Sequence, residues 1–156
     1  MSEKLHPYVV FLPSERKSKI LGAIFGSKAA VDLLKFSLTQ GISNKIYQKD
    51  LMRKLTYSNK TIIGNLKSLT NLGILTEAME KIETNGRTTW VKAYQLSDTG
   101  RWFALLLAEE KDLSAEEKGE ILENIFRKYV KWVKDLSETL HVSAKALKEI
   151  FSEEMK

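Results

Sequence analysis

The sequence predicts a mainly helical protein with one small β-hairpin, that is, an α+β fold followed by a helical extension. Over most of the 156 residues, apolar side chains recur every three or four positions, which is the period of an amphipathic helix. The period changes between residues 74 and 97, where two runs are expected to be strands and the second is rich in Thr, Trp, Val and Tyr. Asn85 and Gly86 separate the two runs, and Asn-Gly is the strongest short signal for a hairpin turn.

Residues 1–19 carry both prolines of the chain and no helical period, which indicates an N-terminal arm with a short strand at Tyr8–Leu12. A short apolar helix is expected over Ile20–Phe25. Ser27 then suits the N-cap of an amphipathic helix that ends at Gly41, because a serine side chain accepts a hydrogen bond from one of the free amides at a helix start.

Two helices in close succession follow a short extended piece around Lys45–Tyr47. The first is predicted over Lys49–Leu55 and the second over Asn59–Leu72, with residues 56–58 as the turn between them. The second helix carries its apolar residues at spacings of four, three and three, which form a single stripe: Ile62, Leu66, Leu69 and Leu72. Gly73 stands where a C-cap glycine belongs, and the strands are predicted at Ile74–Glu83 and Thr88–Ser97.

The last third is predicted to be helical. One helix spans Thr99–Glu110, and the capping box Ser114–Glu117 starts a long helix that runs to about residue 140. Ser143 is expected to cap a final helix. Residues 136–151 also match a helix-turn-helix loosely, but glutamates on the second of its helices would repel phosphates, so packing between helices is the preferred interpretation.

Three segments carry a resemblance to a known fold. SNKTIIGNLKSLTNLGIL (58–75) resembles the recognition helix of the MarR and ArsR regulator families, YQLSDTGRWFALL (94–106) the exit from their wing, and FGSKAAVDLLKFSL (25–38) the first helix of many archaeal members. The resemblance covers about residues 20–107. It implies a winged helix-turn-helix DNA-binding domain at 20–97, between an arm at 1–19 and a helical region at 98–156.

The sequence departs from the pattern of these families at two places. Thr56 and Tyr57 occupy a turn that usually holds a glycine, which affects the expected angle between the two helices. Gly64 stands where a bulky or basic residue is common. This glycine is either a tolerated surface defect or a way to let the helix backbone approach DNA closely.

Charge is divided unevenly along the chain. Residues 1–97 contain 15 Lys and Arg against 7 Asp and Glu, whereas residues 98–156 contain 10 against 13. The basic first part favours a polyanionic partner, although chance variation in a lysine-rich chain would give a similar pattern.

The DNA contacts are predicted on the side of the second helix opposite its apolar stripe, on the hairpin tip and on the preceding helix. Asn59 suits an adenine edge, Ile63 a thymine methyl group, and the lysines guanine or phosphate. Arg87 at the tip suits a narrow minor groove or phosphates. The predicted set is Lys49, Arg53, Lys54, Asn59, Lys60, Thr61, Ile63, Gly64, Lys67, Lys81, Asn85, Gly86, Arg87 and Thr88. An ordinary solvated face is the alternative.

The long helix is apolar over more than one side, which predicts a homodimer. A helix that covers one small domain needs a single stripe of about 100°, so this helix has apolar surface left to bury. The predicted interface is Trp102, Leu106, Ile121, Leu122, Ile125, Phe126, Tyr129, Trp132, Val133 and Leu136. In the alternative, these helices cover their own domain in a monomer.

Other functions find little support in the sequence. It has no cysteine and only two histidines, no Gly-rich phosphate loop and no nucleophile elbow, so neither an enzyme, a metal site nor a cofactor is expected. No apolar run is long enough to span a membrane, which favours a cytoplasmic protein. A winged helix that binds proteins within a transcription or chromatin assembly is the alternative function; a small-molecule effector is left open.

Overall fold

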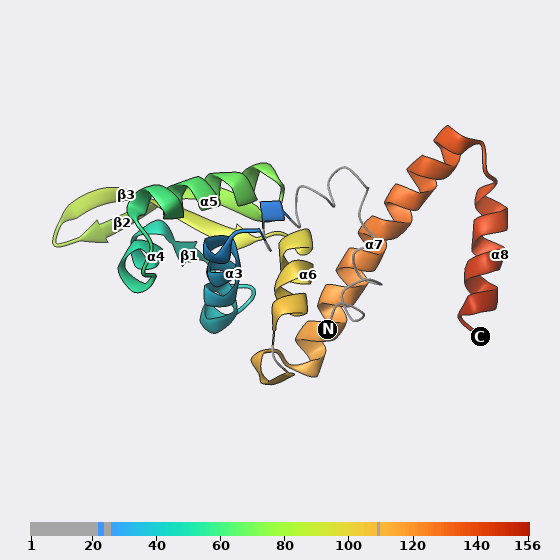
Figure 1. The fold of residues 1–156 in the computed structure, drawn as a ribbon, viewed down its shortest axis with the longest axis horizontal. Helices are drawn as coiled ribbons and strands as arrows, with labels where there is room; N and C mark the ends of the chain where they lie inside the picture. Colours follow the sequence, from blue (N-terminus) through green and yellow to red (C-terminus); the bar gives the residue numbers. More distant parts are fainter. Residues whose placement is uncertain (1–21, 24–25, 109) are drawn as a thin grey trace.

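The computed structural model describes residues 22–23, 26–108 and 110–156. The elements in chain order are α3 (Lys28–Gln40), β1 (Ile46–Tyr47), α4 (Gln48–Lys54), α5 (Asn59–Asn71), β2 (Leu75–Thr84), β3 (Arg87–Leu96), α6 (Asp98–Leu107), a 3-10 turn (Glu110–Asp112), α7 (Ala115–Leu140) and α8 (Ala144–Glu154) (Figure 1). The predicted fold class is confirmed: helices dominate, with one small antiparallel sheet. The strand predicted at Tyr8–Leu12 and most of the helix predicted over Ile20–Phe25 lie outside the described residues.

Serine side chains start four of the helices, as the sequence predicts for Ser27 and Ser114, whereas Ser143 stands at the N-cap of α8 without a cap hydrogen bond from its side chain. The hydroxyl of Ser27 accepts a hydrogen bond from the Ala30 amide at 3.3 Å, and that of Ser58 from the Thr61 amide at 3.2 Å. Ser97 caps α6 in the same way, and Ser114 forms a full capping box with Glu117. Each cap satisfies an amide that has no partner within the helix, so these serines fix where the helices begin.

The sheet has the strand order β1-β3-β2, and all its pairs are antiparallel. The register of β2 and β3 runs from Leu75 opposite Leu96 to Thr84 opposite Arg87. Asn85 and Gly86 form the two-residue turn with φ values of 52° and 76°, and a type I′ turn needs a positive φ at both positions. The hairpin predicted from the Asn-Gly pair is therefore confirmed.

One hydrophobic core joins α3, α5, the root of the sheet and α6. Leu34, Ile62, Leu66 and Phe103 are fully buried in it, and their burial supplies most of the stability of such a domain. The same core continues into the first turns of α7 and crosses the boundary predicted between residues 97 and 98. That boundary, like the rest of the domain division, stays a prediction.

Gly100 permits the close approach of α6 to the loop that follows α5. A Cβ atom at this position would lie 2.0 Å from the carbonyl oxygen of Ile74, which is far inside van der Waals contact. The Ser97 amide donates to that same oxygen at 3.0 Å and holds the start of α6 against the loop. The contact therefore fixes the start of α6 against the loop between α5 and β2.

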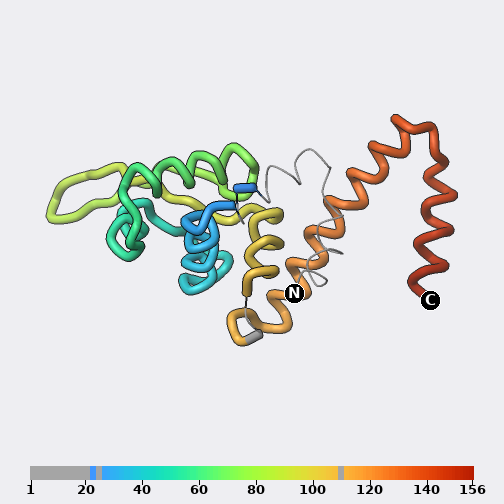
Figure 2. Tube along the Cα trace, viewed as in Figure 1, coloured from blue at the N-terminus to red at the C-terminus, as the bar shows by residue number. Residues whose placement is uncertain are grey.

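The chain trace shows α7 leaving the core and α8 folding back beside it at the C-terminal end of the molecule (Figure 2). Most of the large exposed apolar side chains belong to these two helices rather than to the core region. Among the described residues, no helix combines the length and the apolar character needed to cross a bilayer.

Candidate nucleic-acid interface

The outward face of α5 is polar and basic. Ile62, Leu66 and Leu69 point into the core and are fully buried. Lys60 and Lys67 lie on the opposite side of the helix and are exposed, with Gly64 one turn from each. The structure thus confirms that three of the four stripe residues are buried, Leu72 being the half-buried C-cap, and that the lysines face solvent, while their role in DNA binding stays a prediction.

Within the part of the chain that the structure describes, the side chains of Lys60, Lys67 and Arg87 make no ion pair. The other predicted residues on α5 also remain accessible: Asn59 is exposed, and Thr61 and Ile63 are half-buried. These positive charges are therefore hydrated and can neutralise an external anion without first breaking an internal pair.

The hairpin projects past the end of the molecule where α5 begins (Figure 1). Its tip is exposed at Asn85, Gly86 and Arg87, as are the flanking Lys81 and Thr88. The N-terminal turn of α5 and the hairpin tip consequently lie toward the same end. This is the arrangement in which a helix enters a major groove while a hairpin reaches the neighbouring strand of a duplex.

Trp90 is a residue of the hairpin that the sequence analysis did not select. It is 61% exposed and pairs in register with Lys81, so the two side chains share one face of the hairpin. An exposed tryptophan beside a lysine offers a flat apolar surface next to a positive charge. The only signal in the sequence is the alternation of side chains between the two faces of the strand. This alternation does not reveal where the core ends along the hairpin.

The turn between α4 and α5 is anchored by Tyr57, one of the two residues that depart from the usual glycine. Its hydroxyl donates a hydrogen bond to Asp32 of α3 at 2.6 Å. This hydrogen bond to the Asp32 carboxylate stabilises the protonated phenol and therefore raises the pKa of Tyr57 above its ordinary value. In the same region, the Ser27 hydroxyl donates to the Asn65 side chain at 3.0 Å. These two contacts fix α5 relative to α3 without a glycine in the turn.

The middle of the hairpin is held by Glu80, which lies opposite Val91. One carboxylate oxygen forms a salt bridge with Lys45, and the other accepts a hydrogen bond from the Tyr47 hydroxyl at 2.8 Å. The hydrogen bonds from Lys45 and Tyr47 lower the pKa of Glu80, and the partner carboxylate raises the pKa of both Lys45 and Tyr47. These contacts join β1 to β2 and set the direction of the hairpin, although none of these side chains was selected for that role from the sequence.

Two of the three cations predicted on α4 have partners within the chain. Arg53 lies 3.5 Å from Asp50, and the ammonium of Lys54 lies 5.7 Å from the centre of the Phe36 ring. Lys49 is exposed. These residues contribute positive charge near α5, but the structure gives Arg53 and Lys54 a second role in holding α4.

The predicted dimer interface needs a correction. Trp102 is only 1% exposed, and Ile121 and Ile125 are also buried, because all three pack in the core of their own protomer. They cannot contact a partner without unfolding. The other predicted residues remain accessible in part: Leu122, Phe126 and Leu136 are exposed, and Leu106, Tyr129, Trp132 and Val133 are half-buried.

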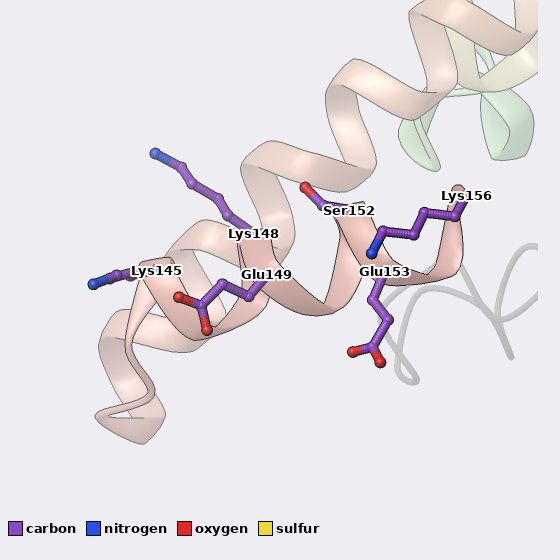
Figure 3. A pocket seen from close by; sticks show the side chains of 6 residues that line it. All are labelled: Lys145, Lys148, Glu149, Ser152, Glu153 and Lys156. Atoms are coloured by element: carbon purple, nitrogen blue, oxygen red, sulfur yellow. The ribbon is translucent and has the colours of Figure 1, made fainter.

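Two hollows lie on the described surface, one on α8 and one beside α7. One is lined by side chains from a single face of α8, among them Lys148, Glu149 and Ser152, and it lies open to solvent (Figure 3). The other, near Ile42 and Arg101 beside α7, has room for about one water molecule. Neither has the apolar, enclosed lining of a small-molecule site.

No protein-family model matches the chain, and no curated protein matches its sequence. Among solved structures, a protein from Methanosarcina mazei Go1 described as a possible transcriptional regulator is similar, with a TM-score of 0.39 and 18% sequence identity. The match covers 80% of this chain and 85% of that one. Both the sequence and the backbone similarity are low, so the function is inferred below from this chain's own residues.

Proposed function

We propose that this protein is a transcriptional regulator that binds double-stranded DNA, with α5 in the major groove and the β2–β3 hairpin on the adjacent minor groove or backbone. The observation that carries the proposal is a set of exposed cations without an ion pair among the described residues, Lys60, Lys67 and Arg87, on a helix face and a hairpin tip at the same end of the molecule. A fold of the winged helix type, resembling the MarR and ArsR regulators, is the scaffold we infer for it.

The side chains of α5 match the chemistry of base edges. A major groove about 12 Å wide admits a single helix, and each base pair displays a distinct pattern of donors and acceptors there. Asn59 suits adenine, Lys60 and Lys67 suit guanine or phosphate, and Ile63 suits a thymine methyl group. Gly64 has open space where a Cβ atom would stand, so nothing inside the described part of the protomer requires a glycine at this position. Close approach of the helix backbone to DNA supplies a reason for it.

The proposed regulator works as a homodimer and in the cytoplasm. A two-fold symmetric dimer presents two copies of α5 to two half-sites of an operator, which raises both affinity and specificity. The apolar surface of α7 and α8 supports the association. No catalytic step is part of this function.

The proposal is tested by measuring duplex affinity with fluorescence anisotropy at about 50 mM salt, where phosphate contacts are strong. The double variant Lys60→Ala/Lys67→Ala is expected to weaken binding roughly tenfold or more, because two phosphate or base contacts are removed. Its matched control is Lys145→Ala/Lys148→Ala, which removes the same charge from α8. Equal affinities for the two double variants would contradict the placement of the interface on α5.

A second function, a protein-interaction module in a larger assembly, is favoured by the exposed apolar side chains of α7 and α8. The two functions are distinguished by measuring DNA affinity and by testing for a co-purifying partner protein. If the wild-type chain shows no affinity for random duplex DNA at about 50 mM salt, while a defined partner protein co-purifies with it, the regulator is excluded.

A further inference from the structure

The face of the hairpin that carries Trp90 continues the face on which α5 packs. In the β2–β3 ladder, Leu75 pairs with Leu96, and Lys81, an even number of residues further along β2, pairs with Trp90. Because side chains alternate between the two faces of a sheet, both pairs lie on the same side. Leu75 and Leu96 are buried in the core cluster that also contains Ile62 of α5. Trp90 therefore points toward the side of the sheet that α5 occupies.

The hairpin is longer than α5 and extends past its first turn. The 13 residues of α5 span about 20 Å, whereas the 10 residues of β2 span about 33 Å. The two elements run in opposite directions from the connection at residues 72–74, and the hairpin continues beyond the start of α5 (Figure 1). Trp90 and Met79 share this uncovered face and are 61% and 50% exposed. Lys60 and Lys67, on the side of α5 away from the sheet, face in the same direction.

The charges of this surface favour a polyanion. Residues 51–76, which include α5, contain four cations and no acidic residue. On the hairpin, two of the three glutamates, Glu77 and Glu80, form salt bridges with lysines. The remaining charged side chains of the hairpin make no ion pair with the described residues; they are Lys81, Glu83 and Arg87. Positive charge is therefore in excess over the joined surface of α5 and the hairpin.

The apolar part of this surface is small and is interrupted by charge. Lys81 stands opposite Trp90, and Lys92 stands opposite Met79. A stable contact between two proteins buries about 800 Å² on each partner, far more than two side chains offer. A DNA strand alternates charged phosphates with less polar sugars, so an indole ring beside an ammonium group matches its chemistry. The patch fits a DNA strand better than a folded protein.

We infer that the indole ring of Trp90 packs against a deoxyribose of the strand that borders the groove entered by α5, while Lys81 meets a neighbouring phosphate. The inference rests on the proposed function and deepens it, because it gives the hairpin an apolar contact on its α5 side in addition to the charge at its tip. Glu83 lies on the same face and repels phosphates, which limits the affinity of this contact.

Duplex affinity of the full-length chain tests the contact. Trp90→Ala is expected to raise the Kd roughly tenfold, because a buried aromatic anchor is lost, while Trp90→Phe retains most of the affinity. The matched control is Ile82→Ala, because Ile82 is also exposed but lies on the opposite face of the hairpin. An unchanged Kd for Trp90→Ala would overturn the inference, as would an equal loss for Ile82→Ala. Thermal denaturation should show that all three variants remain folded.

Salt dependence separates an apolar contact from a phosphate contact. Between about 50 and 200 mM salt, Trp90→Ala should lose the same factor in affinity at each concentration, because no phosphate contact is removed. Glu83→Gln should bind duplex more tightly than the wild type at low salt, because a like charge is removed from the same face. A Trp90→Ala loss that vanishes at the higher salt concentration, or weaker binding by Glu83→Gln, would overturn the inference.

The fluorescence of Trp90 gives a direct measurement of its burial. The emission that disappears in Trp90→Phe belongs to Trp90, and a saturating duplex should shield this component from the neutral quencher acrylamide. A duplex complex in which Trp90 stays as accessible as in the free protein would overturn the inference alone and leave this face of the hairpin open to a protein. A chain that binds no duplex would refute the proposed function itself, and this inference with it.

Discussion

Two amphipathic helices of the molecule, α5 and α7, differ in how their apolar residues are covered. In α5, Ile62, Leu66 and Leu69 are fully buried, and apart from the half-buried Ile63 the outward side chains are polar or basic. In α7 the residues that reach the core, Ile121 and Ile125, leave a second apolar stripe in contact with water. A helix whose apolar residues are all buried has no need of a protein partner, so its free face is available to a polar ligand. A helix with uncovered apolar residues gains stability when another protein covers them.

Substitution of an apolar residue by aspartate gives the sharpest contrast between these helices. Leu66→Asp places an unpaired charge in the fully buried stripe of α5 and is expected to cost about 4 kcal/mol or more, which unfolds most of a marginally stable domain. Leu140→Asp puts the same charge on an exposed position of α7 and is expected to leave the protomer folded while self-association weakens. Thermal denaturation followed by circular dichroism measures the stability of both variants, and sedimentation measures their self-association. A folded Leu66→Asp variant would remove the basis of the comparison.

Much of α5 and the hairpin could be predicted because their signals are local. Ser58, the spacing of Ile62, Leu66 and Leu69, and the Asn-Gly pair each act within a few residues, and the structure agrees with the predicted element to within one or two positions. The boundary of α5 is one residue shorter than predicted, since Leu72 is its C-cap. Local signals suffice here because helix caps and two-residue turns are determined by adjacent backbone geometry.

The contacts that position these elements could not be predicted in the same way. Glu80 meets Lys45 and Tyr47 from more than thirty residues away, and this depends on the register of β1 against β3, which no short pattern encodes. Trp102 illustrates the converse error. Its apolar character predicts that it is buried but does not say which residues cover it. The predicted dimer interface therefore includes Trp102, although it packs in the core of its own protomer.

The comparison also predicts how the hairpin tip responds to salt. Arg87→Ala removes one exposed cation, and if that cation neutralises a phosphate, the slope of log affinity against log salt becomes shallower by about 0.9. Duplex affinity falls several-fold at low salt and little at high salt. Lys156→Ala, at the exposed end of the chain beyond α8, serves as the control of equal charge. Titrations at four salt concentrations distinguish a phosphate contact from a loss of structure, which would change affinity without changing the slope.

Two helical glycines allow a matched test of close approach to DNA. Gly64 in α5 and Gly119 in α7 both have open space where the methyl group of an alanine would stand, so alanine fits at each without a clash. Each substitution is expected to stabilise the fold by about 0.8–1 kcal/mol, because alanine is the better helix former. Gly64→Ala alone should also raise the Kd for duplex DNA, by roughly fivefold if the methyl group costs about 1 kcal/mol of contact. If both variants bind DNA as the wild type does, Gly64 is a tolerated surface defect.

The smallest expected effect concerns the salt bridge and the hydrogen bond of Glu80 in the middle of the hairpin, and it tests the hairpin independently of α5 and α7. Because its partners hold the pKa of Glu80 below that of a free carboxyl group, the contact contributes stability above the ordinary carboxyl range and loses it as the pH falls through the lowered pKa. Acidification should therefore release the hairpin from β1 before it affects α5, which carries no acidic residue. Amide hydrogen exchange in β2 and β3, measured between pH 3 and 6 on the wild type and on Glu80→Gln, checks this. The glutamine variant should exchange faster than the wild type at pH 6 and show no transition of its own, and the difference should disappear below the lowered pKa of Glu80, where the wild-type carboxyl group is also uncharged. Equal exchange in the two proteins at pH 6 would mean that the hairpin is held by its ladder alone.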